Sequence, residues 1–333
     1  MSKYTIAIDA MGGDDVPAVP VEAGIIAARD YGVGIILVGD ESSVHEELQR
    51  HKSASLPIKV LHADDVINEG EHPALALRRK PRSSIAITVG LLKEGIAHAS
   101  ISMGSTGATM AASVFALGLF DGLERPTLGG PFIGLAPETT IIDLGANVDC
   151  KPSQLVNFGS LGASFERFYH KINDPRVALL SVGSEDGKGN KQVQEAFPLF
   201  QSSGLNFVGN IEPHEIFMRK ADVVVCDGFV GNVLLKYTEG LAAAAGQYLA
   251  SKLGNDNPAV AAIEGLAEAA EGGGGPLFGV NGVVIAGHGR SSAKNIAGSV
   301  LLAMQVLDSN FVQTMREDLA RVTTRTGDSD DKS

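Results

Sequence analysis

The stretch "ASISMGSTGATMAASVFAL", residues 99–117, combines the patterns of a strand, a loop and a helix. A short apolar run at 99–103 predicts a buried strand, and apolar residues at helical spacing follow from residue 106. The loop between them contains Gly104, Ser105, Thr106 and Gly107. It suits an anion, because glycines admit a close approach of the backbone and the N–H groups that begin a helix point at the ligand. An ordinary N-cap on Ser105 or Thr106 explains the loop equally well.

The same region also has to be considered as a membrane span. Residues 99–120 are 22 positions without a charge, which is long enough to cross a bilayer. Six of them are Ser or Thr and three are Gly, so the stretch would be a weak span. We therefore expect a strand, a loop and a helix inside a soluble core.

Strand-like runs alternate with helical patterns through most of the chain. The strand candidates are "YTIAIDA", "GIILVGD", "IKVLHA", "ASISM", "TTIIDLG", "RVALLSVG", "LNFVG", "DVVVCDG" and "GVVIAGHG". Continuous apolar strands separated by helices predict a mostly parallel sheet covered on both faces, which is a three-layer αβα sandwich of the α/β class. We expect one large catalytic domain over residues 1–320 and a disordered tail at 321–333. Within the domain, residues 240–275 predict a helical hairpin that breaks at "GNDNP" and ends in a flexible glycine run.

Composition excludes several classes of protein. The net charge is −12, Trp is absent and aromatic residues make up 5%, all of which argue against a nucleic-acid partner. The two cysteines, Cys150 and Cys226, are not in a CxxC pair, which indicates a reducing compartment without disulfides or a zinc site. The first residues enter a strand-like run at once, so we expect no signal peptide and a cytoplasmic location.

Six loops rich in Gly, Asp, Asn and Ser follow strand candidates. They are "DAMGGDD", "SMGSTGA", "DLGANVD", "VGSEDGKGN", "CDGFVGN" and "GHGRSS". Because the carboxyl ends of parallel strands meet at one edge of a sheet, we expect these loops to form a site together. The fourth loop lacks the spacing and the hydroxyl residue of a P-loop, and no G-x-G-x-x-G occurs, so the sequence predicts no nucleotide cofactor.

Single residues of these loops have plain alternative explanations. Lys188, between two glycines, either holds an anion or is a solvated turn residue. His288 is either an acid or base or a packing residue at a strand end. Aspartates at strand ends either bind a metal or anchor the loops, and we favour anchoring because no His lies at ligand spacing. These aspartates are Asp9, Asp14, Asp143, Asp149 and Asp227. We expect no metal site, and neither cysteine has a His partner that would favour a thiol nucleophile.

The run "LRRKPRS" concentrates four cations in five positions, Arg78, Arg79, Lys80 and Arg82. A solvated cationic face is the usual explanation of such a run. In a chain with a net charge of −12, a local basic patch is also how an acidic protein partner would be steered to its site.

Taken together, the loops resemble one family, the bacterial phosphate acyltransferases, which make acyl phosphates from fatty acyl groups carried on acyl carrier protein. The matching stretches include "IAIDAMGGDD", "LRRKPRSS", "SMGSTGA", "DLGANVDCKP", "ADVVVCDGFVGNVLLK" and "AGHGRSSAKNI". They run from residue 5 almost to residue 300, which is nearly the whole chain.

The resemblance implies a fold related to isopropylmalate and isocitrate dehydrogenases and to phosphotransacetylases. It implies a homodimer that converts long-chain acyl-[acyl-carrier-protein] and inorganic phosphate into acyl phosphate, without a cofactor. A membrane acyltransferase would use the acyl phosphate to acylate glycerol 3-phosphate in phospholipid synthesis. The enzyme would be cytoplasmic and loosely associated with the inner face of the membrane, and the hairpin would be its dimer or membrane-side element.

We assign the site residues on this basis. The catalytic residues are Lys188 and Asn232, which hold phosphate and the developing oxyanion, and His288, which protonates the departing thiolate. The residues that bind phosphate or substrate are Asp9, Gly12, Gly13, Gly104, Ser105, Thr106, Gly107, Asn147 and Gly231. The cationic run, Arg78, Arg79, Lys80 and Arg82, is assigned to docking of the carrier protein.

Two features depart from the family, and three other functions compete with it. The family's glycine loop usually reads S-A-G-N-T-G-A, whereas Met103 and Ser105 replace the Ala and the Asn here. The hairpin tip "GNDNP" is polar where an apolar tip would suit membrane insertion. The alternatives are a phosphotransacetylase-like enzyme acting on short acyl-CoA, a decarboxylating dehydrogenase of related fold, and a non-enzymatic scaffold.

Overall fold

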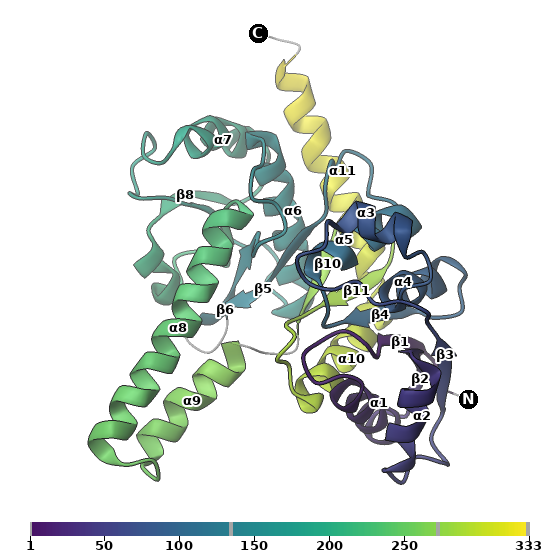
Figure 1. Ribbon diagram of the computed structural model, residues 1–333. Helices are drawn as coiled ribbons and strands as arrows, with labels where there is room; N and C mark the ends of the chain where they lie inside the picture. The colour runs from purple at the N-terminus through teal and green to yellow at the C-terminus, as the bar shows by residue number, and fades with distance from the viewer. Residues whose placement is uncertain (1, 133–135, 271–273, 331–333) are drawn as a thin grey trace. The chain divides into compact units, whose positions relative to one another are not determined.

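The computed structural model describes residues 2–132, 136–270 and 274–330 (Figure 1). The chain divides into two compact units. Unit 1 contains residues 1–119 and 272–312, and unit 2 contains residues 120–271 and 313–333. The single catalytic domain expected over residues 1–320 stays a prediction.

Unit 1 is built on a sheet in the order β3-β2-β1-β4-β11-β10. The strands are β1 (Thr5–Asp9), β2 (Gly34–Gly39), β3 (Ile58–His62), β4 (Ala99–Ser102), β10 (Gly275–Phe278) and β11 (Val283–Ala286). All described pairs are parallel except β10 with β11. The helices are α1 (Ala18–Asp30), α2 (Glu41–Gln49), α3 (Pro73–Arg79), α4 (Ser84–Lys93), α5 (Thr106–Leu117) and α10 (Ala293–Asp308).

Alternate residues of β2 face two different helical layers. Ile35 and Leu37 lie against Gly24 of α1, where an added Cβ would meet them at 3.3 and 3.2 Å. Ile36 and Val38 point to the other face and pack in a cluster with α4. The glycine therefore lets α1 lie close to one face, while α4 and its neighbour α5 cover the other.

Unit 2 repeats this construction with the strand order β5-β6-β9-β7-β8. Its strands are β5 (Thr127–Phe132), β6 (Ala136–Ile142), β7 (Val177–Leu180), β8 (Phe207–Ile211) and β9 (Val223–Val225). Its helices are α6 (Pro152–Tyr169), α7 (Lys191–Ser202), the 3-10 helix η1 (Pro213–Met218), α8 (Gly228–Leu253) and α9 (Pro258–Ala270). A last helix, α11 (Phe311–Asp330), begins at the end of unit 1 and continues into unit 2.

The two faces of the unit 2 sheet are also covered by different helices. Gly162 of α6 lies so close to β9 that an added Cβ would meet the Val223 side chain at 2.6 Å. Val224 belongs to the opposite face, in a core cluster that includes Leu235 of α8. Each unit therefore has helices on both faces of a mostly parallel sheet, and the predicted α/β sandwich class is confirmed.

β5 and β10 are not among the strands predicted from the sequence, and they are the antiparallel strands of the two sheets. β5 pairs with β6, and β10 pairs with β11. Their sequences, "TLGGPF" and "GPLF", contain Gly and Pro, which weaken a strand pattern. Each lies beside a strong apolar strand that supplies its hydrogen-bond partners, so tertiary pairing overrides the weak local signal.

The predicted helical hairpin is present as α8 and α9, which lie side by side (Figure 1). It breaks where expected, because Gly254 has φ +86° and caps α8 just before "NDNP". Residues 271–273 of the glycine run lie outside the described residues. The expected disordered tail differs from the structure, since α11 continues as a helix to Asp330 and only residues 331–333 of the tail lie outside the described residues.

Residues 99–120 form the strand β4, a loop and the helix α5, as the sequence analysis expects. Among the described residues, no helix combines the length and the apolar character needed to cross a membrane.

Candidate active-site loops

Three parallel strands of unit 1 carry loops that contact one another, and we call them the first loop cluster: residues 10–15 after β1, 103–105 after β4 and 287–291 after β11. A Cβ on Gly12 would lie 2.7 Å from the backbone nitrogen of Gly104. The N–H of Asp14 donates to the carbonyl of Gly289 at 2.9 Å. Gly287 donates to the carbonyl of Ser102 at 3.1 Å. Three motifs far apart in the sequence are thus held in a single set of contacts.

Asp9, the last residue of β1, holds this cluster in place by hydrogen bonds. Its carboxylate accepts from the Ser102 hydroxyl at 2.8 Å and from the N–H of Met11 at 3.1 Å, and the Ser102 oxygen in turn accepts from the N–H of Gly104 at 3.2 Å. Burial raises the pKa of the Asp9 carboxyl, against the opposing effect of these hydrogen bonds. Both carboxylate oxygens of Asp9 accept hydrogen bonds from other groups of the protein, which supports the loop-anchoring explanation. Ser102 is not among the site residues assigned from the sequence, although a hydroxyl two residues before Gly104 was a signal for it.

The glycine loop of residues 104–107 combines a helix cap with a possible ligand surface. Ser105 is the N-cap of α5, and its hydroxyl accepts from the N–H of Ala108 at 3.3 Å. The N–H groups of Thr106 and Gly107 belong to the first turn, where a helix has no internal acceptor for them. A Cβ on Gly107 would lie 2.8 Å from the Pro73 ring of α3, so this position requires glycine. The cap explanation is therefore observed, and the same geometry leaves the helix start open to an anion.

Met103, one of the two departures from the family's loop, is a buried side chain. It is 3% exposed, and a Cβ added to Gly287 would lie 2.3 Å from the Met103 sulfur. Met103 therefore packs under the loop after β11 and contributes to the shape of the cluster. Gly13, in the loop after β1, has φ +121°, a backbone conformation that favours glycine.

The second loop cluster comprises the loop after β6, residues 143–151, and the segment after β9, residues 226–232, which includes the start of α8. Asp143 is fully buried, and its carboxylate accepts four hydrogen bonds from residues 145–147, at 2.7 to 3.0 Å. Burial raises the pKa of this carboxyl, and the hydrogen bonds oppose the shift. Asn147 is also fully buried, and its amide donates to Asp143 and, at 2.8 Å, to the carbonyl of Pro126. Both side chains hold the backbone of the loop in place.

The start of α8 fits tightly into this loop. The N–H of Gly228 donates to the carbonyl of Asn147 at 2.7 Å, and a Cβ on Gly231 would lie only 1.8 Å from the carbonyl oxygen of Asp143. Gly231 is therefore required for packing. Asn232, the next residue, is half-buried beside Gly145, and in the described part of the chain its amide has no hydrogen-bond partner. Asn232 lies near the start of α8, and an amide there without a partner is available to donate to a ligand.

Lys188 lies in the exposed loop between β7 and α7. The loop is tied to β8 by the Asn210 amide, which donates to the carbonyl of Glu185 at 3.0 Å. Gln192 of α7 donates to the carbonyl of Cys150, so this loop adjoins the second loop cluster. No ion pair of the Lys188 ammonium exists among residues 2–132, 136–270 and 274–330, so neither Glu185 nor Asp186 fixes it by a direct pair. The lysine is a free cation on a tethered loop.

His288 lies in the first loop cluster and is exposed. Its carbonyl accepts from the N–H of Ser291 at 3.0 Å, which turns the chain toward α10. The three residues assigned to catalysis thus divide between the units, with His288 in unit 1 and Lys188 and Asn232 in unit 2.

Both thiols are poorly suited to nucleophilic catalysis. Burial together with the nearby carboxylates of Asp143 and Asp227 raises the pKa of Cys150 to about 12. Cys226 is fully buried, and burial raises the pKa of its thiol well above the usual range. A thiol needs a lowered pKa to act as a nucleophile at neutral pH, and these two have the opposite shift.

The four cations of the basic run have different surroundings. Lys80 donates to Glu71 at 2.7 Å and to the carbonyl of Val66 at 2.8 Å. Arg82 pairs with Asp64. Arg78 and Arg79 are exposed on α3 and have no such pair among the described residues. Two of the four cations are therefore paired with carboxylates, and Arg78 and Arg79 have no such pair among the described residues.

A cavity of about 360 Å³ lies in unit 2, and its lining includes no residue of the second loop cluster. Its lining includes Asp174 and Pro175, which precede β7, and Leu205 and Asn206, which precede β8. It therefore lies at the amino ends of these strands, opposite the edge that carries the loops. In the described part of the chain, no three His, Cys, Asp or Glu residues are grouped so that they could hold a metal ion.

Comparison with known proteins identifies the family. The chain matches the model of a family described as "Fatty acid synthesis protein" over residues 4–314. It is 42% identical over 327 residues to the phosphate acyltransferase of Pelotomaculum thermopropionicum, covering 95% of both chains. It is 40% identical over 325 residues to the phosphate acyltransferase of Trichlorobacter lovleyi, covering 95% of this chain and 94% of the relative.

Solved structures with low sequence identity share the fold. A phosphotransacetylase from Streptococcus pyogenes has a TM-score of 0.58 at 17% identity and covers 92% of this chain and 94% of its own. A 4-hydroxythreonine-4-phosphate dehydrogenase from Klebsiella pneumoniae has a TM-score of 0.53 at 14% identity, covering 92% and 98%. The chain therefore belongs to the phosphate acyltransferase family, is an acyltransferase, and has a fold that is also found in phosphotransacetylases and dehydrogenases.

Proposed function

We propose that the protein transfers a long-chain acyl group from acyl carrier protein to inorganic phosphate, which releases acyl phosphate and the free carrier thiol. The observation that carries this proposal is the combination of rigid loops with uncommitted donors and the lack of an activated thiol. The Lys188 ammonium, the Asn232 amide and the start of α5 are all available to an anion, whereas burial raises the pKa of both cysteines. Such a protein is suited to hold an anion beside an electrophile rather than to form a covalent enzyme intermediate.

The reaction then needs no enzyme nucleophile. A phosphate oxygen attacks the thioester carbonyl carbon, and the carbonyl oxygen becomes an oxyanion. When this oxyanion collapses, the C–S bond breaks and the pantetheine sulfur leaves as a thiolate. Lys188 and the loop of residues 104–107 bind phosphate, Asn232 donates to the oxyanion, and His288 protonates the thiolate. Placed donors of this kind contribute most where charge develops in the transition state.

The remaining assigned residues hold these groups in position. Gly12, Gly13 and Gly231 allow close contacts between loops, and Asp9 and Asn147 fix the backbone by hydrogen bonds. We propose that these five residues act on substrate through the loops that they position.

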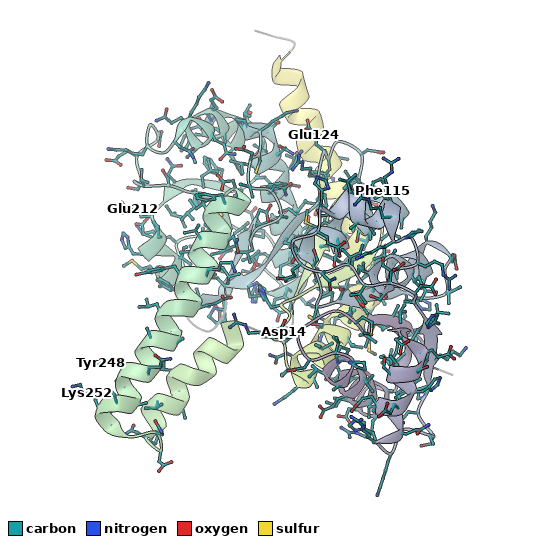
Figure 2. All side chains as sticks on the ribbon, viewed as in Figure 1. Asp14, Phe115, Glu124, Glu212, Tyr248 and Lys252 are labelled. Atoms are coloured by element: carbon teal, nitrogen blue, oxygen red, sulfur yellow. The ribbon has the colours of Figure 1, made fainter. Side chains whose placement is uncertain are left out.

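We propose a homodimer formed through α8. Along this helix, side chains at positions four apart are between 52% and 66% exposed, and Tyr248 extends the same stripe. The stripe consists of Phe229, Val233, Tyr237, Leu241 and Tyr248. Figure 2 labels Tyr248 near the far end of the helix. An apolar stripe of this length on one chain is typical of a surface that a second copy covers.

A charge within the stripe tests the dimer. Tyr237→Glu should convert a wild-type dimer to a monomer in light scattering, because dimerisation would bury the carboxylate. Gln201→Glu adds the same charge at an exposed position of α7 and should leave the dimer intact. A monomeric wild type, or a dimeric Tyr237→Glu variant, would contradict this interface.

We propose a cytoplasmic enzyme that associates loosely with the inner face of the membrane. Acyl phosphate is a reactive acyl donor, so it would pass directly to a membrane acyltransferase that acylates glycerol 3-phosphate. The polar hairpin tip at 254–258 argues against insertion through that element.

The decisive experiment measures release of the carrier thiol from palmitoyl carrier protein with and without inorganic phosphate. We expect release that depends on phosphate and forms acyl phosphate in equal amount. Acetyl-CoA assayed in parallel separates this function from a phosphotransacetylase acting on short acyl groups. Turnover of acetyl-CoA without turnover of the palmitoyl carrier would favour that alternative, and release without phosphate would refute both.

A further inference from the structure

A shallow groove of about 300 Å³ lies on the outer surface of α3, α4 and α5 in unit 1. Its walls are apolar and are formed by Leu77, Pro81, Ala86, Ala112 and Ala116. Phe115 also lines the groove and is 65% exposed, and Figure 2 labels it on this surface. An exposed aromatic ring beside small apolar residues is a typical anchor point for a protein partner.

The charges that line the groove all have one sign. They belong to Arg78 of α3 and Lys93 of α4, and the lining includes no carboxylate. Both cations are exposed, and no ion pair of either is found in the described residues. In a chain with a net charge of −12, this is a local basic rim around an apolar floor. The complementary ligand is acidic and apolar at once, as an acidic amphipathic helix is.

The groove lies along the same helix as the glycine loop. Ala112 and Ala116 follow Thr106, the first residue of α5, by six and ten residues. At 1.5 Å per residue, they lie about 9 and 15 Å from the start of the helix. A partner in the groove that carries its acyl group on a flexible prosthetic arm could therefore present the thioester at the loop.

We propose that an acidic amphipathic helix of the acyl carrier protein docks in this groove, with its apolar face on Phe115 and its carboxylates against Arg78 and Lys93. This inference rests on the proposed function, in which the acyl carrier protein is the acyl donor. It adds Phe115 and Lys93 to the docking surface and removes Lys80 and Arg82, which Glu71 and Asp64 already hold.

Direct binding tests the docking surface without turnover. Fluorescently labelled holo carrier protein is titrated with wild type, Phe115→Ala, Arg78→Glu and Lys93→Glu, and the anisotropy gives each Kd. We expect each of the three variants to raise Kd about tenfold, which corresponds to about 1.4 kcal/mol, since truncated anchors and reversed charges at such interfaces weaken binding by this order. Thermal melting confirms the fold, which should survive because all three side chains are exposed.

Lys52→Glu is the matched control, because it reverses an exposed charge of unit 1 away from the groove. Its Kd should stay within about twofold of wild type, since a distant exposed charge contributes little. Equal Kd values for all variants would overturn the groove as the docking site, and so would an equal loss for Lys52→Glu, which would indicate non-specific attraction. Phosphate-dependent thiol release by wild type is measured separately, so failure of the proposed function is distinguishable from failure of the docking site.

Discussion

Replacement of Lys188 by Ala tests the anion site most directly. The ammonium group is exposed and has no ion pair in the described part of the chain, so its removal should change the free energy of unfolding by no more than about 0.5 kcal/mol. A phosphate oxygen at hydrogen-bond distance, roughly 3 Å, would attract a unit charge by about 1.4 kcal/mol in water and about 5.5 kcal/mol at an effective dielectric constant of 20. The exposed loop that carries Lys188 lies between these limits, and we take about 3 kcal/mol for the lost attraction.

That energy corresponds to a loss of about a hundredfold, because each 1.36 kcal/mol changes a rate or an affinity by a factor of ten. The assay is phosphate-dependent thiol release at a fixed concentration of acyl carrier protein, and the measured quantity is kcat/KM for phosphate. Lys188→Arg keeps the charge and should retain more activity than Lys188→Ala.

Lys191→Ala provides the matched control. Lys191 is a nearby exposed lysine at the start of α7, and its only ion pair among the described residues is with Glu195 at 3.6 Å. The control should keep wild-type kcat/KM. If Lys188→Ala stays within threefold of wild type, or if Lys191→Ala loses as much, Lys188 does not bind phosphate and the reasoning is refuted.

Three further predictions follow from the second loop cluster. Asn232→Ala should lower kcat by about 10²- to 10³-fold with little change in KM for phosphate, as loss of an oxyanion donor does, and an effect confined to KM would contradict this role. Gly231→Ala should destabilise the protein by more than about 2 kcal/mol in thermal melting, because the new Cβ would lie 1.8 Å from the Asp143 carbonyl oxygen; an unchanged melting temperature would disprove the close packing. Cys150→Ser should retain activity, and the native Cys150 thiol should react with iodoacetamide at pH 8 at least about a hundredfold more slowly than a free cysteine, because its pKa is raised to about 12; rapid inactivation by the reagent would contradict this.

The sequence by itself determined the fold class and the place of the loops. Runs such as "YTIAIDA" and "GIILVGD" are apolar over a few residues, and this local property predicts strands whatever the rest of the chain does. Glycine-rich loops directly after these strands predict where a ligand would bind, since parallel strands bring their carboxyl ends to one edge. The ligand-binding role assigned to Gly12 and Gly231 stays a prediction, whereas the structure shows that each packs closely against distant backbone.

Only the tertiary structure decided what the polar groups of those loops do. The Asp9 carboxylate accepts from the Ser102 hydroxyl, and the Asn147 amide donates to the carbonyl of Pro126. The Lys80 ammonium donates to Glu71. Nothing in the local pattern distinguishes these side chains from Lys188 or Asn232, which have no such partners in the described part of the chain. The antiparallel strands β5 and β10 could not be predicted from the sequence for the same reason, since their hydrogen bonds come from neighbours in the sheet. A residue's type and spacing are local properties, whereas its partners are supplied by segments that only the folded chain brings together.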